Sequence, residues 1–186
     1  MSATALVPIA NGSEDIESVT IIDVLRRAGV EVTVASVHAD ATVTAARQTR
    51  ITADTLITGC GDRNFDLVAL PGGMPGARNL GESEPLVDIL RAQKEAGRLY
   101  GAICAAPAVA LEPNGLLEGR RATAHPGFQN QLSDQSRVGE RVVVDGHCIT
   151  SQGPGTALAF ALTLVEYLCG RAKRDEVAAP MVLPDA

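Results

Sequence analysis

The stretch Gly101-Ala-Ile-Cys-Ala-Ala-Pro107 places a cysteine where an apolar, strand-like run gives way to a helix. Small residues follow Cys104, and Pro107 stands where the first turn of a helix tolerates a missing N–H group. A side chain at this point receives unpaired N–H groups and the positive end of a helix dipole, which both favour a thiolate. Cys104 is therefore our candidate nucleophile, although most free cysteines are buried and inert.

Strand-like and helical runs alternate on both sides of this turn. Strands are predicted at residues 5–10, 31–37, 66–70 and 98–103, and helices at residues 14–28, 86–96 and 155–168. Ser13 is the predicted N-cap of the first helix. Asp145-Gly146, between the runs 142–144 and 148–151, is a strong hairpin signal. Continuous apolar strands that alternate with helices predict a mostly parallel sheet covered on both faces.

Length and composition are those of a globular protein with a substantial core. The chain has 186 residues, of which 46% are hydrophobic, and we expect residues 1–186 to form a single domain. Acidic residues outnumber basic ones by 22 to 16, which disfavours nonspecific binding to nucleic acid or to an anionic membrane. No apolar run approaches the roughly 18 residues of a membrane span. The four cysteines lack metal-site spacing, so we expect a cytoplasmic protein with reduced thiols and no metal.

Three turns are expected at the carboxyl edge of the sheet, where parallel folds bind ligands. They carry Glu14 with Glu17, the pair Gly72-Gly73, and Cys104. The plainer interpretation of the two acids is a solvated helix start that complements the dipole. Glu17 could instead point at the thiol. Its pKa would then be raised, and the protonated carboxyl could donate to sulfur and exchange protons with a substrate.

Two further groups complete the predicted site. The backbone N–H groups of Gly73 and Ala105 could form an oxyanion hole near the sulfur, although glycine pairs are also common in ordinary turns. His125 follows a short strand-like run, residues 121–124, where a base for Cys104 could sit. A lone histidine is more often a satisfied surface residue. The other three cysteines are assigned no chemistry.

The chain resembles the ThiJ/PfpI superfamily nearly end to end, in the branch of the Parkinson-disease-linked protein deglycase and its bacterial chaperone-like relatives. Each matching motif is modest alone, and together they are highly specific. These motifs are Gly12-Ser-Glu-Asp-Ile-Glu17, Arg26-Arg-Ala-Gly-Val30, Leu70-Pro-Gly-Gly73, Ala102-Ile-Cys-Ala-Ala-Pro107, Ala124-His-Pro126 and Ser151-Gln-Gly-Pro-Gly-Thr156. The resemblance implies a flavodoxin-like α/β/α sandwich of three layers, a homodimer formed partly through the first helix, and no cofactor.

The resemblance also implies roles for the residues of the site. Cys104 is expected to be an oxidation-sensitive nucleophile and Glu17 the carboxylic acid that hydrogen-bonds it. His125 is expected to be the neighbouring histidine. Gly73 and Ala105 are expected to bind an oxyanion through their backbone N–H groups.

Two positions concern an anion site expected near the dimer partner. The resemblance implies that Arg47 lies near this site. Gln152 stands where the human-type branch has arginine, as in bacterial relatives. The resemblance therefore does not extend to a sulfinate pocket built by that arginine.

The expected function is a cofactor-independent, cysteine-dependent activity of the glyoxalase III or protein deglycase type. It would act on methylglyoxal or glyoxal and their early adducts, in oxidative and carbonyl stress defence. An alternative is a redox-sensing, chaperone-like protein whose Cys104 oxidises to sulfinate. Peptidase and isonitrile hydratase activities rank lower. The expected partners are a small dicarbonyl or glycated substrate and a second copy of the chain, with no membrane and no direct nucleic-acid binding.

Overall fold

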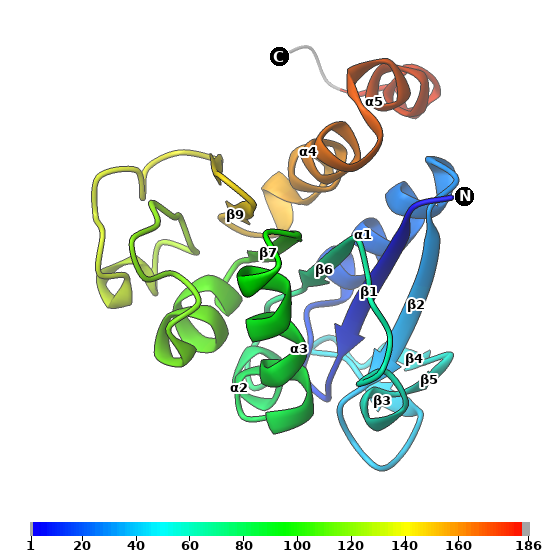
Figure 1. Ribbon diagram of the computed structural model, residues 1–186, viewed down its shortest axis with the longest axis vertical. Coiled ribbons are helices and arrows are strands. Elements are labelled where there is room, and N and C mark those ends of the chain that lie inside the picture. The colour runs from blue at the N-terminus through cyan, green and yellow to red at the C-terminus, as the bar shows by residue number, and fades with distance from the viewer. Residues whose placement is uncertain (1, 184–186) are drawn as a thin grey trace.

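A seven-stranded sheet forms the centre of the protein, which a computed structural model describes over residues 2–183 (Figure 1). The strand order is β5-β2-β1-β6-β7-β9-β8, and all neighbours are parallel except β8 and β9. These strands are β1 (Thr4–Ile9), β2 (Glu31–Ser36), β5 (Thr55–Leu56), β6 (Leu67–Leu70), β7 (Leu99–Ile103), β8 (Val142–Asp145) and β9 (Cys148–Ser151). The predicted hairpin is therefore the antiparallel edge of the main sheet. Residues 1 and 184–186 of the expected domain lie outside the described residues.

Helices cover both faces of the sheet, which confirms the predicted three-layer, flavodoxin-like α/β/α class. They are α1 (Asp15–Arg27), α2 (Gly76–Gly81), α3 (Glu84–Glu95), α4 (Ala157–Cys169) and α5 (Arg171–Ala178). Leu67 and Ala69 of β6 pack in the cluster formed with α1 and α4, whereas Val68 and Leu70 pack in the cluster formed with α2 and α3. Successive side chains of a strand point to opposite faces, so a continuous apolar run packs into the hydrophobic clusters on both faces of the sheet.

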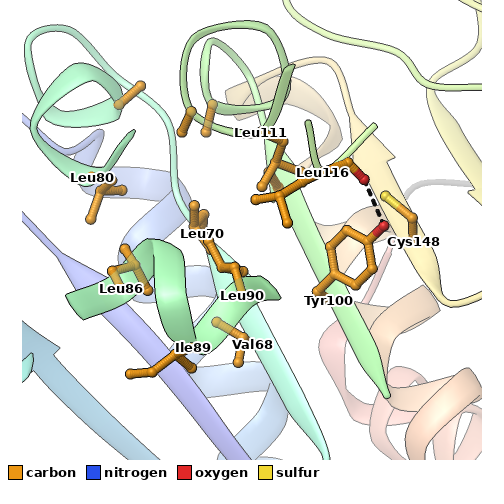
Figure 2. Packing of buried hydrophobic residues seen from close by; sticks show 14 of the residues in the cluster. Val68, Leu70, Leu80, Leu86, Ile89, Leu90, Tyr100, Leu111, Leu116 and Cys148 are labelled. Atoms are coloured by element: carbon orange, nitrogen blue, oxygen red, sulfur yellow. Dashed lines mark hydrogen bonds between the residues drawn. The ribbon is translucent and has the colours of Figure 1, made fainter. Parts of the chain in front are cut away.

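Figure 2 shows the packing on the face covered by α2 and α3. Leu70 of β6 lies near Leu90 of α3, and Tyr100 of β7 stands further along the sheet. The Tyr100 hydroxyl donates a hydrogen bond of 2.8 Å to the Leu116 carbonyl, and Cys148 lies beside it. Burial raises the pKa of the Cys148 thiol to about 12. This cysteine is therefore a protonated core residue, as expected.

One predicted strand is absent and one hairpin was missed. Residues 121–124 do not form a strand, because β9 is already paired with β7 on one side and β8 on the other. The Thr123 N–H group bonds the Thr150 side chain instead. A second hairpin, β3 (Thr42–Thr44) with β4 (Arg50–Thr52), was not predicted from the sequence. Both of its strands are short and partly exposed, so they lack the apolar run of a buried strand.

The topology places three loops together at one edge of the sheet. β1 lies between β2 and β6 in the sheet. The chain therefore passes from β1 to β2 on one side of β1 and later returns to form β6 on the other side. The loops that follow β1, β6 and β7 emerge at the carboxyl ends of adjacent parallel strands. Such a switch point is the usual ligand site of an open α/β sheet. No helix within residues 2–183 is long and apolar enough to cross a membrane.

Candidate active site

Cys104 lies in the turn between β7 and one π-helical turn, Pro107–Leu111. Its φ of 66° is uncommon for a residue with a side chain and costs conformational energy. Two hydrogen bonds hold this backbone in place. The Cys104 N–H group donates to the Ser151 carbonyl at 3.0 Å, and the Cys104 carbonyl accepts from His125 N at 2.8 Å. The turn thus holds a thiol at the carboxyl edge of the sheet, with 8% of the residue exposed.

The glycine pair of the β6–α2 loop packs its backbone against this turn. A Cβ atom on Gly72 would lie 2.5 Å from the Cys104 Cβ, so no side chain fits there. Gly73 has a φ of 84°, and a Cβ on it would lie 2.5 Å from the Glu14 nitrogen. This close approach brings the N–H groups of Gly73 and Ala105 near the Cys104 thiol, whose pKa they lower. That these two groups bind an oxyanion stays a prediction.

Glu17 is a fully buried carboxyl on the first turn of α1. Its Oε2 accepts a hydrogen bond of 2.8 Å from Gly72 N, and the Cys104 thiol lies close enough to influence the pKa of the carboxyl. Oε1 has no hydrogen-bond partner among residues 2–183. Burial raises the pKa of Glu17 to about 7, although the Gly72 N–H group opposes the shift. Because Oε2 already accepts a hydrogen bond, Oε1 is the oxygen that can carry a proton on this carboxyl.

The pKa of the Cys104 thiol is raised to about 12, first by burial and then by the negative charge of Glu17. The N–H groups of Gly73 and Ala105 lower it by less. The thiolate expected at this turn is therefore opposed by burial and by the Glu17 charge, which outweigh the two N–H groups. When Glu17 is protonated its repulsion vanishes and the two N–H donors remain. Cys104 and Glu17 thus titrate as a coupled pair, which loses its second proton only at high pH.

His125 is joined to the Cys104 turn through its backbone. Its imidazole is exposed, and Nδ1 accepts a hydrogen bond of 3.1 Å from Gly127 N. This bond places the proton of the neutral ring on Nε2. The ring also packs edge-on against Phe128, with centroids 6.2 Å apart. His125 therefore lies at the rim of the site, and its described ring contacts are with Gly127 and Phe128.

Arg47 and Gln152 are placed differently from the thiol and its acid. Arg47 is exposed in the turn between β3 and β4, and its backbone N–H donates to Asp15 Oδ2 at 2.8 Å. Thr49 N donates to the other oxygen of Asp15, so the hairpin is tied to the start of α1. The Gln152 side chain donates to the Val138 carbonyl at 3.2 Å. Arg47 thus reaches the first turn of the Glu17 helix through its backbone.

Two residues near the thiol have contacts that the sequence analysis did not assign. Glu14, not Ser13, is the N-cap of α1, and its Oε2 accepts a hydrogen bond of 2.8 Å from Glu17 N. The Ser13 hydroxyl is used elsewhere, as acceptor for Ala10 N. Gly72 supplies the N–H group that binds Glu17. The three-residue spacing of Glu14 and Glu17 was the available signal, because an N-cap side chain reaches the N–H group three positions later.

Comparison with known proteins places this geometry in a family. Residues 3–167 match the model of the DJ-1/PfpI family. Protein DJ-1 homolog B of Arabidopsis thaliana is 50% identical over 90% of this chain, which spans only 38% of that longer protein. A protein of Caenorhabditis elegans named glutathione-independent glyoxalase DJR-1.2 is 35% identical over 98% of this chain and 96% of its own length.

Solved structures agree with this placement. Oxidized DJ-1 of Toxoplasma gondii superposes with a TM-score of 0.96 at 42% sequence identity. The match covers 99% of this chain and 100% of the Toxoplasma chain. Fold, motifs and sequence identity agree over nearly the whole length, and the chain therefore belongs to the DJ-1/PfpI family.

Proposed function

We propose that this protein is a cofactor-independent glyoxalase or deglycase that uses Cys104 to convert methylglyoxal or glyoxal and their early adducts. At the level of the family, a glyoxalase-type activity is supported by the name of the Caenorhabditis elegans relative. For this chain, the observation that carries the proposal is a buried carboxyl, Glu17, against a thiol that two backbone N–H groups also face. In this proposal Cys104 is the nucleophile, Glu17 carries protons, and the N–H groups of Gly73 and Ala105 bind the oxyanion.

The first step is attack of sulfur on the aldehyde carbon of methylglyoxal. Ionised Glu17, with a pKa of about 7, takes the thiol proton as the S–C bond forms. The aldehyde oxygen becomes an oxyanion, which the N–H groups of Gly73 and Ala105 stabilise. Glu17 then returns the proton to this oxygen, which gives a neutral hemithioacetal.

The second step moves a proton between adjacent carbons. Glu17 removes the proton from the carbon bound to sulfur and delivers it to the ketone oxygen, which gives an enediol. Glu17 then takes the hydroxyl proton from the carbon bound to sulfur and delivers it to the former ketone carbon, which yields a thioester of lactate on Cys104. Water then cleaves the S–C bond and restores the thiol, with His125 at the rim assisting the water. The sum is methylglyoxal plus water to lactate, and no oxidant or reductant is consumed.

The test is conversion of methylglyoxal to lactate by the purified protein without glutathione. Wild type is expected to turn over, and Cys104→Ala is expected to lose activity while it keeps its circular dichroism spectrum. Cys169→Ala serves as a matched control, because Cys169 is a half-buried cysteine at the end of α4. Equal rates for wild type and Cys104→Ala would exclude a cysteine-dependent mechanism.

A redox sensor is the second candidate, and one observation favours it. A sulfinate on Cys104 would find the N–H groups of Gly73 and Ala105 and a protonated Glu17 as hydrogen-bond donors, and these stabilise an anion. Mild peroxide is then expected to add two oxygens to Cys104 before any other cysteine. A chaperone-like role would follow from that oxidised state. Oxidation of Cys60 or Cys148 first would argue against this candidate.

The working unit is proposed to be a cytoplasmic homodimer of single-domain chains. Ile16 and Val19 on α1 are 57% and 50% exposed, and both are apolar. Burial of these side chains against a second copy would remove apolar surface from water. Sedimentation of wild type and of Val19→Lys tests this, since the variant is expected to sediment as a smaller species.

A further inference from the structure

Three hydrogen bonds join Glu14, Glu17 and Gly72 in a closed cycle. Glu17 N donates to Glu14 Oε2 at 2.8 Å, Gly72 N donates to Glu17 Oε2 at 2.8 Å, and Glu14 N donates to the Gly72 carbonyl at 2.9 Å. Each residue gives its backbone N–H to the next member. The cycle fixes the start of α1 against the loop that packs on Cys104, so the orientation of the Glu17 carboxyl depends on Glu14.

Glu14 is an unusual N-cap, because serine, threonine, aspartate and asparagine are the residues that helices prefer there. A shorter side chain could serve as the cap, as Ser13 was expected to. The carboxylate of Glu14 adds a negative charge within one turn of Glu17, and like charges disfavour ionisation of the neighbour. Repulsion by Glu14 is in fact among the causes that raise the pKa of Glu17.

The other groups that face Glu17 are few. From the β7 turn it meets the Cys104 thiol, and from the β6–α2 loop the Gly72 N–H group. Helix α4, which packs along α1, buries only apolar side chains there, such as Phe160 and Leu164. Glu14 is therefore the charged side chain placed to bias the proton on Glu17.

We propose that Glu14 is a positioning residue that fixes the Glu17 carboxyl against the Gly72 loop beside Cys104 and disfavours its ionisation. Its side chain bonds the Glu17 N–H group, so it acts through Glu17. The inference rests on the proposed function, because that function gives Glu17 the task of carrying a proton. The cycle of hydrogen bonds orients the Glu17 carboxyl, and the negative charge of Glu14 disfavours its ionisation.

The test is the titration of the Glu17 carboxyl by carbon NMR in a Cys104→Ser background, where Glu17 no longer shares a proton with a thiol. Glu14→Gln keeps an oxygen to cap Glu17 N but removes the charge. We expect it to lower the pKa of Glu17, by less than burial raises it, and so to shift the protonated-to-ionised ratio at neutral pH toward the ionised form. The Glu17 signal is assigned with Glu17→Gln.

The matched control is Asp15→Asn, which removes the same charge from the same first turn. Asp15 accepts hydrogen bonds from Arg47 N and Thr49 N of the β3–β4 hairpin and is not part of the cycle. It is expected to leave the Glu17 titration unchanged. An unchanged pKa in Glu14→Gln, or an equal decrease in Asp15→Asn, would overturn the proposal. Because the titration needs no turnover, its result is independent of whether methylglyoxal is the substrate.

Discussion

Replacing Glu17 with glutamine should remove a pH dependence from the stability of the protein. Glu17 has a pKa of about 7 in the folded state against an ordinary value of 4.5. Between these two values the folded state binds more protons than the unfolded state. The corresponding stability is therefore fully present below pH 4.5 and is lost as the pH rises through 7.

The magnitude follows from the two pKa values. Proton linkage gives Glu17 a contribution of about 2.6 kcal/mol at pH 5 and about 0.1 kcal/mol at pH 8. Between pH 5 and pH 8 the free energy of unfolding of wild type should therefore fall by about 2.5 kcal/mol more than that of Glu17→Gln. With a urea m-value of about 2.5 kcal/mol per molar, that is a relative shift of about 1 M in the midpoint. The raised pKa of Cys104 acts above pH 9 and does not contribute here.

The assay is urea unfolding at pH 5 and pH 8 for both proteins at one fixed concentration. Other titrating groups are common to both, so the difference of differences isolates Glu17. Glu95→Gln is the matched control, because Glu95 is an exposed glutamate at the end of α3. Its pH dependence should parallel that of wild type. If Glu17→Gln also parallels wild type, the reasoning that Glu17 is buried beside the thiol with a raised pKa is refuted.

Two further substitutions test the packing around the site and the core. Gly72→Ala would place a Cβ 2.5 Å from the Cys104 Cβ. It should therefore lower the free energy of unfolding by about 1–3 kcal/mol, measured as a lower thermal midpoint. It should also lower the alkylation rate of Cys104. Gly155→Ala, where a Cβ meets nothing within 4 Å, should do neither. Tyr100→Phe leaves the buried Leu116 carbonyl without its donor and should lower the free energy of unfolding by about 1–2 kcal/mol. An unchanged urea midpoint would contradict a stabilising hydrogen bond between Tyr100 and Leu116.

Prediction from sequence succeeded where burial leaves a pattern along the chain. β1, β6 and β7 are buried on both faces, so each reads as a continuous apolar run with a turn at its end. The Asp145-Gly146 signal also located the β8–β9 hairpin correctly. The short β3–β4 hairpin carries no such pattern, because residues such as Arg50 and Thr52 are exposed.

The chemistry of the site was harder to predict, because it depends on contacts between distant segments. The positions of Cys104 and Glu17 followed from topology and resemblance. The sign of the Cys104 pKa shift did not, since the raising effects of burial and of the Glu17 charge require the packed geometry. The N-cap was assigned to Ser13 because propensity favours serine, whereas the structure engages the Ser13 hydroxyl with Ala10 N.

Alkylation of Cys104 by iodoacetamide across pH, with mass mapping of all cysteines, tests whether Cys104 and Glu17 act as one unit. In wild type, Cys104 is expected to react first, with a rate that still rises above pH 8, because burial and the Glu17 charge raise the pKa of the thiol to about 12. In Glu17→Gln the charge is absent, so the rise in rate should shift to lower pH. The same profile in both proteins, or faster reaction at another cysteine, would contradict the pairing of this thiol with this acid.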